Sequence, residues 1–180
     1  MKLTTAEKLT TVISSVAILL STWTFYESYI KESYSLKAAI IDREFGHSSK
    51  KVNINSGLIL YNDGNKPIVV LSTYLEISSS VGTIRTKSKP PITLKPSEAQ
   101  AVIINESFAP EELTGELEPS SDENNSQARA EIIILTYGSH GESIKKRITV
   151  FTVVFNKIQE SFQALEDKQS SENFVAIVKS

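Results

Sequence analysis

The residues with the greatest chemical potential in this sequence are two histidines and a serine beside one of them. His47 and His140 each lie close to glycine in a predicted turn. A histidine pair can bind a metal, but zinc sites normally need at least three protein ligands, and neither histidine has carboxylates at ligand spacing. Ser139 precedes His140 in Gly-Ser-His-Gly, which is not the strand-to-helix elbow of a G-x-S-x-G nucleophile. We therefore interpret all three as turn residues and predict no catalytic residue, no metal site and no cofactor.

An acidic segment in the predicted loop at residues 105–127 is the second candidate. Its carboxylates belong to Glu111, Glu112, Glu116, Glu118, Asp122 and Glu123. Calcium prefers oxygen ligands, but the spacing does not match the D-x-[DN]-x-[DN]-G register of a calcium-binding loop. We interpret the segment as a solvated loop.

Composition excludes several other functions. The sequence has no cysteine, which removes disulfide frameworks, thiolate metal sites and cysteine nucleophiles. No G-x-x-x-x-G-K-[ST] or G-x-G-x-x-G motif is present for phosphate binding. The net charge is −2 and the basic residues form no long tract, so we predict no nucleic-acid binding. The triplet Lys145-Lys146-Arg147 could contact anionic lipid or an acidic partner, but we favour charges that keep an apolar strand soluble. The chain is therefore not expected to be an enzyme.

Residues 9–26, LTTVISSVAILLSTWTFY, contain no charge and lie between Lys8 and Glu27. As a helix rising about 1.5 Å per residue, this segment would be about 27 Å long, against roughly 30 Å for a bilayer core. Trp23 and Tyr26 lie at its far end, where aromatic rings favour the headgroup region. We predict a single-pass anchor in the cell membrane. The alternatives are a signal peptide, although no clean A-x-A-like site follows, a helix lying in the interface, although its polar face has no Lys or Arg, and a helix packed on a soluble domain.

Small residues form a stripe along this helix at alternating spacings of four and three: Thr10, Ser14, Ala17, Ser21 and Thr24. Small side chains let two helices approach closely in a membrane, so we predict that the helix associates with itself or with a partner helix. Lys and Arg are nearly balanced on its two sides. Because the amino-terminal tail is short and closely charged, we expect it inside, with the bulk of the chain outside the cytoplasm.

A two-residue hydrophobic period follows the anchor. Val52, Ile54, Leu58 and Leu60 alternate with mostly polar residues, and Val69, Leu71, Thr73, Leu75 and Ile77 form the clearest strand face. Strands at intervals of roughly ten residues predict a sandwich or barrel.

Residues 130–137 and 143–155 are the clearest predicted hairpin. The first strand is apolar on both faces, so we expect it to be central in a sheet. Ile158, Phe162 and Leu165 follow at helical spacing, which predicts a helix within residues 156–168 that covers one of these faces.

Two motifs of turn residues carry a family resemblance. Residues 61–68, YNDGNKPI, contain an N-x-G-x-x-P hairpin, and residues 94–98, LKPSE, match an L-x-P-G-E turn with Ser97 in place of glycine. Together they resemble the immunoglobulin-like β-sandwiches of bacterial single-pass membrane-anchored proteins. The resemblance implies a fold and a location at a membrane, and it transfers no active site.

The predicted organisation is mainly β. Residues 1–33 form a tail, transmembrane helix and stalk, residues 34–155 an immunoglobulin-like antiparallel β-sandwich with a long acidic loop at 105–127, and residues 156–180 a short C-terminal helix and tail. The expected function is a membrane-anchored binding or assembly module whose partners are the lipid bilayer and either another protein or a second copy of the chain. The alternative is a sensor or effector whose sandwich detects a signal and whose Ser/Thr-rich helix oligomerises in the membrane.

Overall fold

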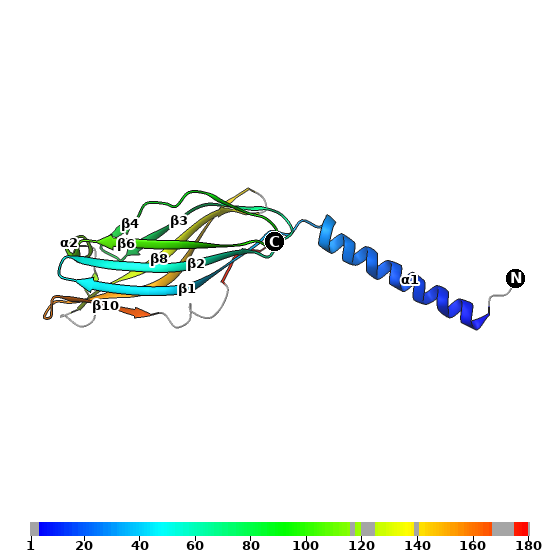
Figure 1. Cartoon of the computed structure of the whole chain (residues 1–180), viewed down its shortest axis with the longest axis horizontal. Helices are drawn as coiled ribbons and strands as arrows, with labels where there is room; N and C mark the ends of the chain where they lie inside the picture. Colours follow the sequence, from blue (N-terminus) through cyan, green and yellow to red (C-terminus); the bar gives the residue numbers. More distant parts are fainter. Residues whose placement is uncertain (1–3, 116–117, 120–124, 139–140, 167–174, 180) are drawn as a thin grey trace. The chain divides into compact units, whose positions relative to one another are not determined.

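A computed structural model describes residues 4–115, 118–119, 125–138, 141–166 and 175–179 of the chain. The chain divides into two units, Met1–Ser33 and Tyr34–Ser180 (Figure 1). The first unit is an apolar helix and the second is mainly β, which confirms these two parts of the prediction. Each unit is described separately below.

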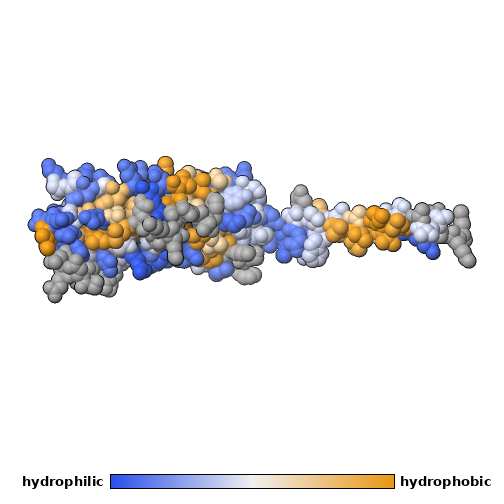
Figure 2. Space-filling view, turned by 90° about the horizontal axis from the view of Figure 1, so that it is seen from below, coloured by the Kyte–Doolittle hydropathy of each residue, from blue (hydrophilic) through white to orange (hydrophobic). Residues whose placement is uncertain are grey.

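The first unit contains α1 (Thr5–Phe25) and one π-helical turn, η1 (Tyr26–Ile30). Its segment Lys8–Ser28 is, by length and composition, apolar enough to span a membrane. Hydrophobic residues gather along the middle of the helix (Figure 2). The hydroxyls of Ser15, Thr22 and Thr24 each donate to the carbonyl oxygen four residues earlier, at 2.9 Å. Because these donors are satisfied within the helix, they are compatible with apolar surroundings.

Two antiparallel sheets form the second unit. The smaller sheet has the order β11-β1-β2-β6, and the larger has the order β10-β9-β8-β3-β4, with β5 paired to β3 and β7 paired to β8. The elements are β1 (Ser35–Ser48), β2 (Lys51–Asn62), β3 (Ile68–Ser78), β4 (Thr83–Arg85), β5 (Ile92–Leu94), β6 (Ala99–Phe108), α2 (Pro110–Thr114), β7 (Glu118–Pro119), β8 (Asn125–Tyr137), β9 (Ser143–Asn156), β10 (Ser161–Glu166) and β11 (Val175–Lys179).

One hydrophobic core takes its side chains from both sheets. Its largest fully buried members include Leu36, Ile54, Leu58, Leu60, Leu75, Ile77, Ile132 and Phe151. Each sheet therefore has an inner face in this core and an outer face directed away from it, as alternating strands require. The prediction that Val52, Ile54, Leu58 and Leu60 share a buried face is confirmed.

A β-bulge divides the predicted face of β3. The register against β8 shifts between Val70 and Ser72. As a result Leu75 and Ile77 are buried in the core, whereas Val69, predicted on the same face, is exposed. A bulge adds one residue to one strand, so it reverses the inside–outside pattern without leaving a clear trace in the sequence.

Asn62 joins the two turn motifs at one end of the smaller sheet. Its buried side-chain amide donates to the carbonyl oxygens of Leu94 at 3.0 Å and Lys66 at 2.8 Å, and its Oδ1 accepts from the backbone N–H of Gly64 at 3.0 Å. The backbone N–H of Ser97 donates to the carbonyl oxygen of Asn62 at 2.9 Å. Ser97 has a φ of 61°, so the serine keeps the left-handed conformation that glycine adopts most easily. The two motifs thus form one structural unit.

The predicted hairpin of residues 130–137 and 143–155 is confirmed. β8 pairs with β9 from Asn125 to Tyr137, with Tyr137 opposite Ser143. β8 also pairs with β3, so it is central in its sheet, and Ile132, Ile133 and Ile134 are all buried.

The predicted C-terminal helix is wrong. The chain turns after β9, where Asn156 Oδ1 accepts from the backbone N–H of Ile158 at 3.0 Å. Residues Ser161–Glu166 then form β10, which pairs with β9. Phe162 is buried, whereas Ile158 and Leu165 are exposed. Three apolar residues over so short a span are compatible with a helix and equally with a turn followed by a strand. Backbone pairing with β9 stabilises the strand.

Candidate binding surfaces

Of the two histidines and the serine singled out for metal or nucleophile chemistry, the structure describes His47 alone. His47 packs against Phe162, with 5.4 Å between ring centroids, while Ser139 and His140 lie outside the described residues. Within the described ranges, no group of three His, Asp or Glu side chains could hold a metal ion. Glu112 of the acidic segment accepts from the backbone N–H of Ala109 at 3.1 Å, so it caps α2.

Strands occupy both ends of the acidic segment at residues 105–127. β6 runs to Phe108, and β8 begins at Asn125. Glu116, Asp122 and Glu123 lie outside the described residues.

The small residues of the predicted helix stripe all lie on α1: Thr10, Ser14, Ala17, Ser21 and Thr24. Because α1 is continuous, spacings of four and three keep them on one face. The hydroxyl of Thr24 donates to the carbonyl oxygen of Leu20 at 2.9 Å, so this polar group is already satisfied within the helix. Association through this face stays a prediction.

An apolar patch lies on the outer face of the smaller sheet. We call it the isoleucine patch, and it comprises Ala39, Ile41, Gly57, Ile59, Ala101 and Ile103. The register places Ala39, Ile59 and Ala101 in one row across three strands, with Gly57 beside Ile103 in the next row. Ile41 and Ile103 are 58% and 63% exposed. Contiguous exposed apolar surface on a folded protein usually marks a binding site.

Gly57 forms the floor of the isoleucine patch. A β-carbon added at Gly57 would lie 3.0 Å from Cγ1 of Ile41, so any larger residue would push that side chain away from its position across the strand. Ile41 reaches this position because the register of β1 against β2 shifts between Ile40 and Asp42. The hydroxyl of Ser56 donates to the carbonyl oxygen of Asp42 at 3.2 Å and holds the bulge. The sequence analysis missed this patch because alternation alone does not reveal a bulge.

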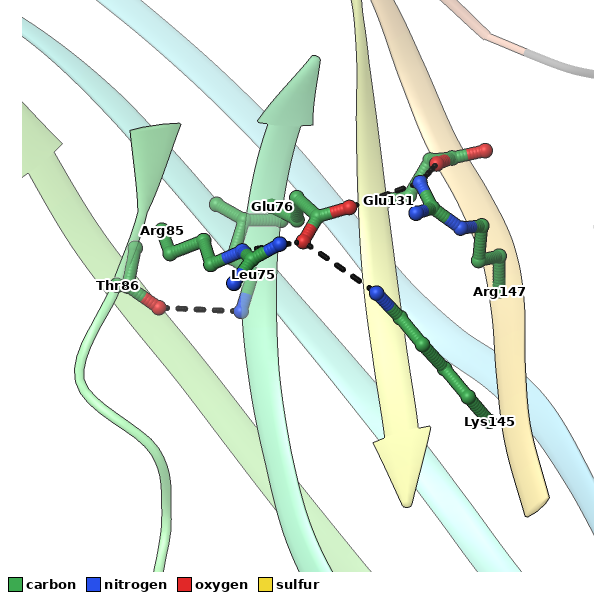
Figure 3. Close-up of polar contacts among 7 residues, drawn as sticks. All are labelled: Leu75, Glu76, Arg85, Thr86, Glu131, Lys145 and Arg147. Carbon is green, nitrogen blue, oxygen red and sulfur yellow. Dashed lines mark hydrogen bonds and ion pairs between the residues drawn. The ribbon is translucent and has the colours of Figure 1, made fainter. Parts of the chain in front are cut away.

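The outer face of the larger sheet carries a cluster of charges around a buried carboxylate. We call it the Glu76 cluster: Glu76, Arg85, Glu131, Lys145 and Arg147 (Figure 3). Glu76 Oε2 lies 2.8 Å from Nε of Arg85 and 3.7 Å from Nζ of Lys145, and its Oε1 lies 2.8 Å from Nη1 of Arg147. Glu131 lies 2.9 Å from the same nitrogen of Arg147. The residues come from β3, β4, β8 and β9, so the cluster links four strands.

The Glu76 cluster presents cations to solvent and hides the carboxylates. The side chain of Glu76 is 1% exposed, against 62% for Arg85 and 46% for Arg147. The hydrogen bond to Glu131 raises the pKa of Arg147 above its ordinary value, with the charge of Glu76 acting in the same direction. Fully buried Ile133 lies between Tyr74 and Arg147 in the register of this face, outside the core cluster. Tyr74 and Arg147 therefore flank the apolar outer face of β8, the face that the predicted C-terminal helix was expected to cover.

Comparisons with known proteins identify no family. No family model matches the chain, and no curated protein matches it. Among solved structures, a protein from Archaeoglobus fulgidus is 14% identical with a TM-score of 0.43, and the match covers 67% of this chain and 96% of that protein. A protein from Bordetella pertussis described as a putative ApaA protein is 12% identical with a TM-score of 0.39, and the match covers 76% of this chain and 96% of that protein. A protein described as late embryogenesis abundant is 14% identical with a TM-score of 0.43, covering 92% and 90%. With TM-scores below 0.5, these likenesses support no statement about the family or function of this chain.

Proposed function

We propose that this protein is a membrane-anchored binding or assembly module without enzymatic activity. In this proposal α1 crosses the cell membrane once, the bulk of the chain lies outside the cytoplasm, and the two sheets form an immunoglobulin-like β-sandwich that binds a protein partner. The isoleucine patch carries the proposal, because it is an exposed apolar surface on a rigid sheet. The apolar span Lys8–Ser28 supports the membrane anchor.

The isoleucine patch has the properties of the centre of a protein interface. Fully burying an isoleucine side chain contributes about 1.5–3 kcal/mol, so covering two isoleucines that are more than half exposed contributes roughly 2–3 kcal/mol. Isoleucine has few rotamers to lose, and the strands beneath it are already paired, which keeps the entropic cost of binding low.

Polar side chains of the same face border the isoleucine patch. Asn55 donates to Glu44 at 2.9 Å, and Ser107 donates to Asn53. An apolar centre with a polar rim is the usual arrangement of a protein–protein interface, and a partner with an exposed aromatic or aliphatic side chain fits it.

Site-specific photo-crosslinking in membranes tests the proposal. A crosslinking amino acid is placed at position 41 or 103 of the full chain, and the matched control is position 158, because Ile158 is equally apolar and 73% exposed on the turn after β9. We expect one discrete adduct from positions 41 and 103 and none from position 158. We further expect Ile103→Ser to abolish the adduct at position 41, while Ile158→Ser leaves it unchanged. Equal adducts at all three positions would contradict the proposal.

Fractionation and a reporter fused to the carboxyl terminus test the anchor and its orientation. Intact, uncleaved chain in the soluble fraction without detergent would contradict the anchor. The small-residue stripe is tested by replacing Ser14, Ala17 and Ser21 with leucine, which should weaken self-association in a membrane dimerisation assay. Membrane leakage on overexpression that disappears in the same variant would instead support the sensor or effector.

A further inference from the structure

A polar pocket adjoins the Glu76 cluster on the outer face of the larger sheet. Its volume is about 360 Å³, and Ser78, Gln127, Arg129 and Thr152 line it together with the turn after β3. It lies where β8 changes its partner strand, since Arg129 pairs with Ser78 of β3 whereas Gln127 pairs with β7. The end of one strand and the start of another leave a recess in the sheet at this point.

Arg129 is the central cation of this pocket. The register places it between Ser78 on β3 and Thr152 on β9, so a hydroxyl-bearing residue lies on each side of it in the same row. Its side chain is exposed, and it makes no hydrogen bond or ion pair with any residue in the described ranges. The three other cations on this face, in contrast, all contact Glu76.

The charges around the pocket favour an anion. Arg129 is the one charged residue among the described residues that line the pocket, and the neighbouring Glu76 cluster holds three cations and two carboxylates. Both carboxylates already accept from arginine. A phosphate monoester carries a charge of about −1.5 to −2 at neutral pH, and a guanidinium can donate two parallel hydrogen bonds to such a group.

We propose that the pocket around Arg129 binds a phosphate monoester. Arg129 holds the phosphate oxygens, and the hydroxyls of Ser78 and Thr152 and the amide of Gln127 supply further hydrogen bonds. The phosphate group belongs either to a small soluble molecule or to a lipid headgroup such as that of phosphatidic acid. This site lies on the opposite outer face from the isoleucine patch and does not depend on the proposed function.

Calorimetry on the full chain in phosphatidylcholine nanodiscs tests the proposal. The probes are inorganic phosphate and glycerol 3-phosphate, titrated at constant ionic strength. We expect saturable binding, weakened about tenfold or more by Arg129→Gln, since a hydrogen bond to a charged group contributes at least that factor. Lys87→Gln is the matched control, because it removes the same charge from an exposed position outside the pocket and should leave the affinity unchanged.

Two further variants keep the test informative if Arg129→Gln does not fold. Arg129→Lys keeps the charge but loses the two-pronged donor, and Thr152→Val removes one hydroxyl at constant shape, so both should weaken binding by smaller factors. Nanodiscs with phosphatidic acid distinguish the sources. A higher unfolding temperature in them, lost in the Arg129 variants and absent with soluble phosphates, would assign the site to a lipid headgroup. No binding in either arm, or equal binding by wild type and the Arg129 and Thr152 variants, would overturn the proposal.

Discussion

We predict that the variant Glu76→Gln lowers the free energy of unfolding of the second unit. The glutamine keeps the size of the side chain and one carbonyl acceptor, but it removes the negative charge from the centre of three cations. The lost interactions are the two contacts at 2.8 Å, from Arg85 and Arg147, because the contact of Lys145 at 3.7 Å is too long for a strong hydrogen bond.

The expected loss follows from the burial of the two sides. A hydrogen bond to a charged group contributes about 1.5–3 kcal/mol, but the side chains of Arg85 and Arg147 are 62% and 46% exposed and regain water, which reduces each contribution to roughly 1 kcal/mol. We therefore expect the free energy of unfolding to fall by about 2 kcal/mol. For a unit of this size that loss lowers the unfolding temperature by about 4–8 °C.

Thermal unfolding of the full chain in detergent micelles, followed by the circular dichroism of the strands, measures this effect. The matched control is Lys145→Gln, which removes a charge from the same face at the long contact and should change the free energy of unfolding by less than about 0.5 kcal/mol. The difference between wild type and Glu76→Gln should persist at high salt, because a buried carboxylate is screened less than a surface ion pair. A loss below about 0.5 kcal/mol for Glu76→Gln would refute the view that this carboxylate holds the four strands together.

Further predictions concern the stability and shape of the two sheets, with urea unfolding as the common measurement. Asn62→Ala should lower the free energy of unfolding by about 2–4 kcal/mol, because it leaves the buried carbonyl groups beneath it without donors; a loss under about 1 kcal/mol would contradict its role in joining the turns. Ser97→Gly should raise the free energy of unfolding by about 0.5–1 kcal/mol, because glycine adopts the positive φ without strain. Thr73→Val should leave stability unchanged or raise it by up to about 1 kcal/mol, since the buried Oγ1 of Thr73 has no hydrogen-bond partner in the described part of the chain. Gly57→Val should destabilise by about 1–3 kcal/mol through contact with Ile41, and an unchanged unfolding midpoint would show that this side chain moves freely.

The strands of the second unit were largely predictable from the sequence. The alternation in β2, the two-sided apolar pattern of β8 and the return strand β9 each produced the element that the structure contains. These signals are strong because every second residue of β2 lies in the core and nearly every residue in the middle of β8 is buried. β10 was not predictable, because Phe162 is the one buried residue of the three apolar residues at helical spacing, and Ile158 lies in the turn before the strand.

Neither candidate surface could be located from the sequence. The isoleucine patch needs the bulge beside Ile41, and the position of Glu76 among its cations depends on the register of β3 against β8 and of β8 against β9. One signal was available. Glu76 and Glu131 each interrupt an apolar strand, and a carboxylate in such a position normally has a cation as partner. The identity of that cation is set by pairing between residues far apart in the chain.

The position of β11 has a consequence for how the protein matures. β11 follows the other described strands in the chain, yet it pairs with β1, the first of them. During synthesis, β1 and β2 can pair as soon as both emerge, while the other edge of β1 at Ser35–Ala38 keeps its backbone donors and acceptors open until β11 has been made, and β11 ends at Lys179, long after β2 ends at Asn62. At translation rates of about 5–20 residues per second that interval is at least several seconds, long enough for a neighbouring nascent chain or a chaperone to occupy the open side of the strand.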